Sequence, residues 1–463
     1  MKKGNRTTGK REIDMIHGTI GSKTMRFALP LAVTGILQQL FNAADIAVIG
    51  QFCGKQAMAA VGSNSPVVGI MVTMFIGISL GANVVIARFT GRGDEAGVRR
   101  GVHTSILLAL LFGCGMMVFG ELIASPLLRL LDVPEEIMAM AMRYLRIYLI
   151  GLPVIFLYNF ESAIFRSQGD TKTPLICLTI SGVVNVGLNL FFVLVVGLNV
   201  EGVALATVIA NLVSSTMLFW RLTHYSGLIR VRRAELRIDR STLRAILRIG
   251  LPSGLQNAVF SISNLCIQSA INSLGSDVIA ASSAAFNIEI FVYYVTNSFG
   301  QAVTTFIGQN YGAEDYRRCR RVTRICLLQD MIVTVAAAFL ILGFGHQLLH
   351  LFNSDPTVIE VGYIRLTYIL SGEALSVLIE IFSGSMRGYG YSALPAFMSL
   401  IGVVGVRIGW VFIVFPHYRT FASLLVVYPI SWAVTSAALI AVYFILRHRR
   451  LDPYFARRQQ PQT

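Results

Sequence analysis

The sequence predicts an all-α polytopic membrane protein, with twelve transmembrane helices arranged in two six-helix lobes. Of its 463 residues, 54% are hydrophobic and only 14% are charged, whereas soluble domains carry about 25% charged residues. Apolar windows long enough to cross a bilayer of roughly 30 Å recur along the chain. Similar stretches also recur at a constant separation of 221 residues, which indicates an internal duplication.

Each predicted helix is an apolar window of about 20 residues or more. The first 23 residues are polar and basic, and the apolar run after them is too long for a signal peptide, so we expect it to be retained as the first helix. The windows that begin at 280 and 357 are long enough to be tilted or bent. The twelve windows lie near 25–49, 61–87, 101–125, 138–164, 174–197, 202–224, 246–272, 280–308, 322–345, 357–384, 392–415 and 421–446.

The duplication sets the predicted domain organisation. Arg166–Pro174 reads RSQGDTKTP and Arg387–Pro395 reads RGYGYSALP, and the same shift maps Asp94 onto Asp315. Because each half holds an even number of helices, both halves enter the membrane from the same side, as in transporters built from parallel repeats. We therefore expect an N-terminal segment (1–24), an N-lobe (25–225), a linker loop (226–245), a C-lobe (246–447) and a C-terminal tail (448–463).

The distribution of basic residues predicts the orientation. The formal net charge is +15, and 32 of the 39 Lys and Arg residues fall in the N-terminal segment, in the loops on the same side, or at the C-terminus. Basic loops face the cytoplasm, so we expect both termini there. The positive charge is thus explained by topology, and no nucleic-acid partner is expected.

Several kinds of catalytic and metal site are not indicated. The six cysteines form no CxxC pair and are interpreted as small core residues. No GxxxxGK[ST] loop, serine elbow or HExxH motif occurs, so we expect neither an ATPase nor another enzyme. His346 and His350 have the spacing of zinc ligands but lack an evident third ligand, and we interpret them as interfacial.

Asp45 is the most informative residue, because a carboxylate inside an apolar span is costly and usually functional. Two lobes related by a parallel repeat suit a transporter that works by alternating access. Gln38 and Asn42 share the helical face of Asp45 and are candidates for binding the transported substrate, or cargo. The alternative is that Asp45 reaches the water interface from near the end of its helix.

Three polar residues of the fifth and sixth windows are candidate partners of Asp45. Asn185 and Asn189 share one helical face, and Thr207 follows in the next helix. With Asp45 they offer hard oxygen ligands, suited to sodium or, through the acid, to a proton. The alternative is ordinary hydrogen bonding between helices. We expect a coupling ion here, a metal site only if that ion is sodium, and no cofactor.

The second half carries its own acids. Glu289 and Glu373 are candidates for binding a cationic cargo, whereas for Arg407 we favour a structural ion pair with an acid of the same lobe. Glu161 and Glu380 lie nearer the cytoplasmic helix ends, where solvation is an alternative.

Polar and aromatic residues interleave in the seventh and eighth windows. Asn264 and Tyr294 represent two such stripes, which are suited to a flat organic cation through stacking and cation–π contacts. The alternative is that the aromatic rings face lipid or the core.

Seven short motifs, in this order and spacing, are similar to those of one known family. They are ALP at 28–30, IGQF at 49–52, AMAAVGSNSP at 57–66, GANVVIARFTGRGD at 81–94, RSQGDTKTP at 166–174, GQNYGAED at 308–315 and RGYG at 387–390. Over nearly its whole length the chain resembles the MATE (multidrug and toxic compound extrusion) transporters.

The resemblance implies a V-shaped pair of lobes and antiport, in which an often cationic organic compound leaves as sodium or protons enter. By position, Asp45 matches the family's ion-binding aspartate, and Asn185 and Thr207 match further members of that cluster. Asn189 departs from the many relatives that carry aspartate there. We expect a monomer in the lipid bilayer of a bacterial inner membrane, with small organic substrates.

Three alternatives to an antiporter remain. The nearest is a lipid-linked saccharide flippase of the same superfamily, which often has extra helices and a basic cavity. A membrane-embedded enzyme would need a catalytic cluster at one depth, which the sequence does not show. A non-transporting receptor or scaffold would lack antiport activity.

Overall fold

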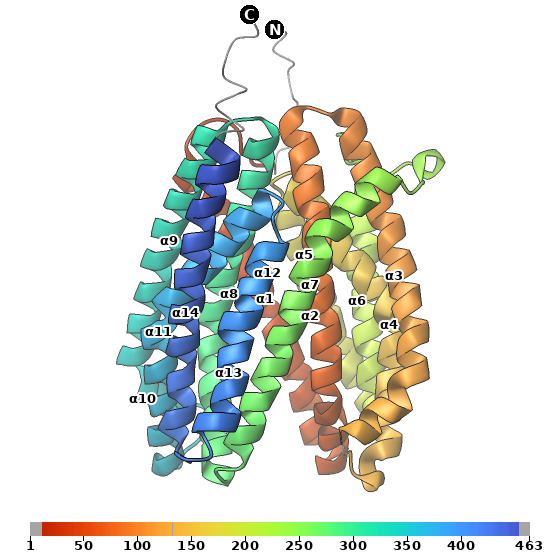
Figure 1. Ribbon diagram of the computed structural model, residues 1–463. Helices are drawn as coiled ribbons and strands as arrows, with labels where there is room; N and C mark the ends of the chain where they lie inside the picture. Colours follow the sequence, from red (N-terminus) through yellow and green to blue (C-terminus); the bar gives the residue numbers. More distant parts are fainter. Residues whose placement is uncertain (1–11, 132, 453–463) are drawn as a thin grey trace, which may run out of the picture. The chain divides into compact units, whose positions relative to one another are not determined.

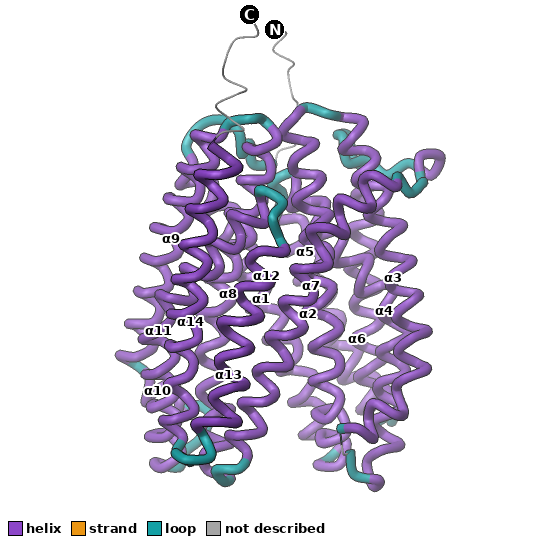
Figure 2. Tube along the Cα trace, in the orientation of Figure 1, coloured by secondary structure: helices purple, strands orange, loops and turns teal. Residues whose placement is uncertain are grey.

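The described part of the chain is almost entirely helical. The computed structural model describes residues 12–131 and 133–452, and these contain no strand (Figures 1 and 2). The α-helices are α1 (Ile20–Val48), α2 (Lys55–Arg92), α3 (Glu95–Leu130), α4 (Glu135–Ser167), α5 (Lys172–Leu190), α6 (Val200–Thr223), α7 (Arg240–Asn272), α8 (Ser276–Gly312), α9 (Tyr316–Gly343), α10 (Gly345–His350), α11 (Pro356–Gly388), α12 (Ala393–Ser399), α13 (Val406–Gly409) and α14 (Phe421–Leu446).

Short π-helical and 3₁₀ turns complete the helical structure. The π-helical turns extend or join the α-helices, so that α12 and α13 form one continuous segment from 393 to 414. The π-helical turns are Ile49–Cys53, Phe191–Val195, Leu400–Gly405, Trp410–Val414 and Arg447–Leu451, and the 3₁₀ turn is Arg233–Glu235.

Eleven segments of the described residues are long and apolar enough to span a membrane. The predicted seventh span, 246–272, lies within α7, which is long enough to cross but is less apolar. Its polar stripe explains the difference, because Asn257, Ser261, Asn264 and Gln268 recur along one side of the helix.

The chain divides into two compact units. Of the described residues, unit 1 contains 12–14 and 33–247 without 132, and unit 2 contains 15–32 and 248–452. The predicted N-lobe began at 25, whereas residues 25–32, the first part of α1, belong to unit 2. Contacts explain this grouping: Thr24 donates to Gln329 Oε1 at 2.6 Å, and Phe27 packs edge-on against Phe306. Residues 1–11 of the predicted N-terminal segment and 453–463 of the predicted tail lie outside the described residues.

The two halves repeat the same helices in the same order. The first residues of α2 and α8, α3 and α9, α4 and α11, α5 and α12, and α6 and α14 are each separated by 221 positions, which is the shift found in the sequence motifs. In unit 1, α4 packs against α2, α3 and α6, and in unit 2 its counterpart α11 packs against α8, α9 and α14 (Figure 1). The packing therefore follows the duplication.

Local signals fix these helix boundaries. Asp94 caps α3 by accepting a hydrogen bond from the Gly97 amide at 2.7 Å, and Asp315 caps α9 in the same way from the Arg318 amide at 2.8 Å. In the RSQGDTKTP motif, Gly169 has φ of +88° and lies so close to Ile13 that a Cβ would approach its carbonyl oxygen to 2.6 Å. Its repeat counterpart Gly390 has φ of +78°.

Candidate functional site

A cluster of polar side chains lies inside unit 1, where α1, α5 and α6 meet. Asn189 Nδ2 on α5 donates to Asp45 Oδ1 on α1 at 2.5 Å, and Thr207 Oγ1 on α6 donates to Asp45 Oδ2 at 3.2 Å. Both carboxylate oxygens are therefore held by neutral donors from other helices. None of the ion pairs of the described residues involves Asp45.

The fourth predicted member completes the cluster. Asn185 lies one turn before Asn189 on α5, and its Oδ1 accepts from Asn189 Nδ2 at 3.3 Å. Its Nδ2 donates to Thr207 Oγ1 at 3.5 Å. The structure therefore brings together all four residues predicted to bind the coupling ion, namely Asp45, Asn185, Asn189 and Thr207. Their role as ion ligands stays a prediction.

One atom of the cluster has no partner. Asn189 is fully buried, and no donor among the described residues forms a hydrogen bond with its Oδ1. Leaving a buried acceptor unpaired is costly, and a hard cation or an added proton near Asp45 would satisfy it. The donor set of one carboxylate, two amide oxygens and a hydroxyl fits sodium as well as a proton.

The candidate cargo residues divide between the units. Gln38 and Asn42 lie on α1 in unit 1, and Asn42 is exposed, but no hydrogen bond joins either to Asp45. Asn264, Glu289, Tyr294 and Glu373 lie on α7, α8 and α11 in unit 2. Tyr294 contacts the ring of its neighbour Tyr293. Their role in cargo binding stays a prediction.

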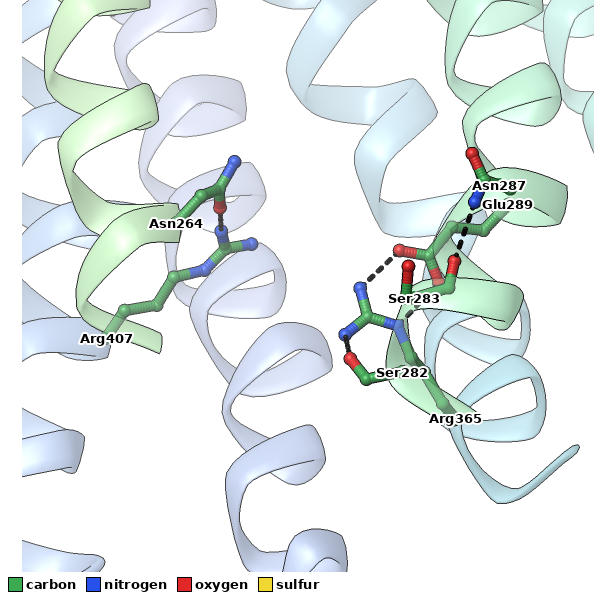
Figure 3. Close-up of polar contacts among 7 residues, drawn as sticks. All are labelled: Asn264, Ser282, Ser283, Asn287, Glu289, Arg365 and Arg407. Carbon is green, nitrogen blue, oxygen red and sulfur yellow. Dashed lines mark hydrogen bonds and ion pairs between the residues drawn. The ribbon is translucent and has the colours of Figure 1, made fainter. Parts of the chain in front are cut away.

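Glu289 does not stand alone in unit 2. Arg365 Nε donates to Glu289 Oε2 at 3.1 Å and Nη2 donates to Oε1 at 2.5 Å, while Nη1 donates to Ser282 at 2.8 Å (Figure 3). Sequence reasoning missed this bidentate pair, because the partners lie 76 positions apart. The signal available in the sequence was an arginine inside the apolar window 357–384.

The structure corrects the interpretation of Arg407 as a structural ion pair. Arg407 is buried, but none of the ion pairs within 4.0 Å in the described residues involves it. Its Nη1 donates to Asn264 Oδ1 at 3.1 Å (Figure 3). Its Nε donates to Ser431 Oγ at 3.2 Å. Both acceptors are neutral. Glu373, one of the acids of the same lobe, is also buried.

The other titratable residues singled out in the sequence differ in their burial and partners. Glu161 was open to solvation but is fully buried, with Oε2 accepting from Ser215 at 2.9 Å. Glu380 is 3.4 Å from Arg387. His346 pairs with Glu360 at 3.4 Å, and the described residues contain no group of three or more His, Cys, Asp or Glu side chains able to hold a metal.

A family model described as MatE matches residues 30–191 and, again, residues 252–413. The chain belongs to the MatE family. The two matches repeat the duplication seen in the helices, and together they cover most of the chain. Since MatE proteins are transporters, the protein is a membrane transporter and not an enzyme.

Curated relatives and solved structures agree with this family. The chain is 28% identical over 442 residues to a probable multidrug resistance protein, YoeA of Bacillus subtilis, covering 92% of this chain and 94% of that one. It is 25% identical over 407 residues to a probable multidrug resistance protein, NorM of Thermotoga maritima, covering 86% and 87%. An outward-facing multidrug resistance MATE transporter has the same fold, with a TM-score of 0.86, 22% identity and coverage of 96% and 98%.

Proposed function

We propose that this MatE transporter is an antiporter that exports organic compounds, often cationic, while sodium or protons enter through the Asp45 cluster. The observation that carries the proposal is a carboxylate inside a membrane-spanning unit, held only by neutral donors beside an unpaired, buried Asn189 oxygen. An intramembrane acid in this setting requires a proton or cation. The relatives named for multidrug resistance support the cargo class.

The coupling follows from where the ligands lie. Asp45, Asn189 and Thr207 belong to three different helices of unit 1, so ion entry changes the contacts that hold these helices together. An ion shifts a transporter between two states only by its differential affinity for them. The membrane potential adds about 2.3 kcal/mol per charge per 100 mV. The ion acts as a co-substrate, and the mechanism requires no bound cofactor.

The basic loops support a location in the bacterial inner membrane with both termini in the cytoplasm. Both predicted halves span the membrane an even number of times, which requires the termini to share one side. We further propose that the protein works as a monomer, since each half contributes its own complete set of packed helices.

The test uses purified protein in liposomes and follows efflux of a fluorescent organic cation under a sodium gradient or a proton gradient. One gradient should drive the wild type, and neither should drive Asp45→Asn, which keeps the size of the side chain but removes its charge. Asp277→Asn makes the same change at an exposed position in the first turn of α8 and should transport normally. Full transport by Asp45→Asn would refute the proposal.

A further inference from the structure

Unit 2 contains a polar cluster built on the same plan as the ion cluster of unit 1. The unit 1 cluster takes Asp45 from the first helix of its half, two asparagines from the fifth and Thr207 from the sixth. In unit 2, the first helix supplies Asn264, the fifth supplies Arg407, and the sixth supplies Tyr428 and Ser431.

The repeat register supports this correspondence. Tyr428 lies 221 positions after Thr207, which is the shift that relates the helix starts. Arg407 follows the 221-position counterpart of Asn185 by one residue. In the first helix of each half, Ala28–Pro30 and Gly250–Pro252 match at a shift of 222, so the counterpart of Asp45 is Ile267, and Asn264 lies three positions before it. The second half has therefore kept the place but replaced an acid-centred cluster with one centred on a guanidinium.

The guanidinium is held in a fixed orientation. It lies over the Tyr428 ring at 4.2 Å from the centroid, with the Trp432 ring at 5.8 Å. Its Nη1 donates to Asn264 (Figure 3) and its Nε donates to Ser431, whereas Nη2 makes no hydrogen bond to the described residues. Arg407 is buried, whereas Asn264, whose Oδ1 accepts from Nη1, is exposed.

The other charges of unit 2 do not neutralise Arg407 directly. The Arg365–Glu289 pair neutralises itself through two hydrogen bonds. Glu373 interacts electrostatically with Arg407 but forms no ion pair with it within 4.0 Å. A buried guanidinium without a contacting carboxylate is costly in a membrane protein and usually marks a functional site. Its planar fork suits carboxylate and phosphate groups.

We propose that Arg407, with Tyr428, Asn264 and Ser431, binds an oxyanion group, carboxylate or phosphate, carried by the organic cargo. This inference rests on the proposed function, since it assigns a chemical group to the cargo of the same transporter. It extends the cargo class to amphoteric and anionic compounds. The aromatic rings of Tyr428 and Trp432 supply the apolar surface that a flat organic molecule requires.

The test compares rhodamine B with its ethyl ester, which share a cationic ring system but differ in the free carboxylate. Binding to the purified full-length protein is measured by fluorescence polarisation, without an ion gradient. The wild type should bind rhodamine B about tenfold more tightly than the ethyl ester, because only rhodamine B has a carboxylate that accepts charge-assisted hydrogen bonds from the guanidinium. A wild type that does not prefer the acid overturns the proposal.

Variants locate the preference. Arg407→Gln should abolish the preference by lowering the affinity for rhodamine B. It should not lower the affinity for the ethyl ester, because the substitution removes a positive charge that repels this cation. Arg407→Lys should keep part of the preference, because the charge stays but the fork is lost. Arg419→Gln, at an exposed arginine of the same half, should bind both probes like the wild type. An unchanged preference in Arg407→Gln, or an equal loss of both probes, contradicts the proposal.

A measurement on the wild type alone covers the case in which Arg407→Gln does not fold. Sodium benzoate should displace rhodamine B but not its ester. The control is sodium chloride at the same concentration. Equal displacement of both probes overturns the proposal. The antiport proposal can fail independently of this one. If neither gradient drives efflux but the wild type still prefers rhodamine B over its ester, ion coupling is contradicted and the oxyanion site is not.

Discussion

Replacing Asn189 by aspartate should change the number of ions that the transporter carries per cargo molecule. The Asn189 amide nitrogen lies 2.5 Å from Asp45 Oδ1, so a second carboxylate would face the first at this distance. Two charges centred about 4 Å apart repel by about 4 kcal/mol at an effective dielectric constant of 20. That energy corresponds to about three powers of ten in an equilibrium constant. Two carboxylates at such a distance do not both stay ionised and unbound.

In the Asn189→Asp variant, the Asp45 carboxylate and the new carboxylate together therefore have to bind one more proton or sodium ion than the wild-type cluster binds. The assay is a reversal measurement in liposomes at zero membrane potential, in which the ion gradient is varied until cargo flux stops. At zero membrane potential and without leak, a cargo gradient of about 100-fold is balanced by an ion gradient of about 100-fold if one ion is exchanged per cargo molecule. If two ions are exchanged, an ion gradient of about 10-fold is sufficient. We expect the variant to reverse near the smaller gradient.

Asn159→Asp makes the same substitution on α4, where the asparagine donates only to the backbone oxygen of Ile155, and should reverse like the wild type. Reversal of Asn189→Asp at the wild-type gradient, with transport intact, would refute the reasoning. It would mean that the added carboxylate does not share an ion with Asp45, and that the Asp45 cluster is not the coupling site.

Two further predictions concern stability. Glu289→Gln should lower the free energy of unfolding by about 3–5 kcal/mol, because it leaves the buried Arg365 guanidinium without its carboxylate; an unchanged melting temperature in detergent would contradict a structural role for the pair. Hydrogen bonds from Ser241 and then Thr242 lower the pKa of Asp239 from 3.8 to about 2, so its stabilising effect is present above about pH 4 and is lost as the pH falls toward 2. Asp239→Ala should therefore melt below the wild type at pH 7, with a smaller difference at pH 3, and a constant difference would contradict this origin.

The helices and the duplication were largely predictable from the sequence. Apolar windows set the approximate spans, and local signals such as the Asp94 and Asp315 caps set the ends. These signals depend only on neighbouring residues. The assignment of 15–32 to unit 2 was not predictable, because it depends on contacts such as that of Thr24 with Gln329, 305 positions away.

The two polar clusters differ in how much the sequence revealed. Asn185 and Asn189 share a helical face, and Asp45 is conspicuous in an apolar span, so their meeting was predicted before the structure. Arg407 was interpreted as half of an ion pair because the same lobe contains acids in other predicted helices. Whether a buried arginine faces a carboxylate or an aromatic ring depends on side-chain packing between helices, and spacing along one helix carries no information on it.

The duplication explains why the two clusters occupy matching places with different chemistry. Helix starts are fixed by capping and by apolar length, and from α2 and α8 onward the corresponding starts have been kept at a shift of 221 positions. Side chains that line a polar cluster inside the unit contribute little to those signals, so they can change without moving a helix. Thr207 and Tyr428 illustrate this, since both lie at the same position of corresponding helices, and one donates to a carboxylate while the other lies under a guanidinium. If both proposals hold, the acid in one half and the arginine in the other bind a cation and an oxyanion in the same cycle, which a symmetric pair of acids cannot do.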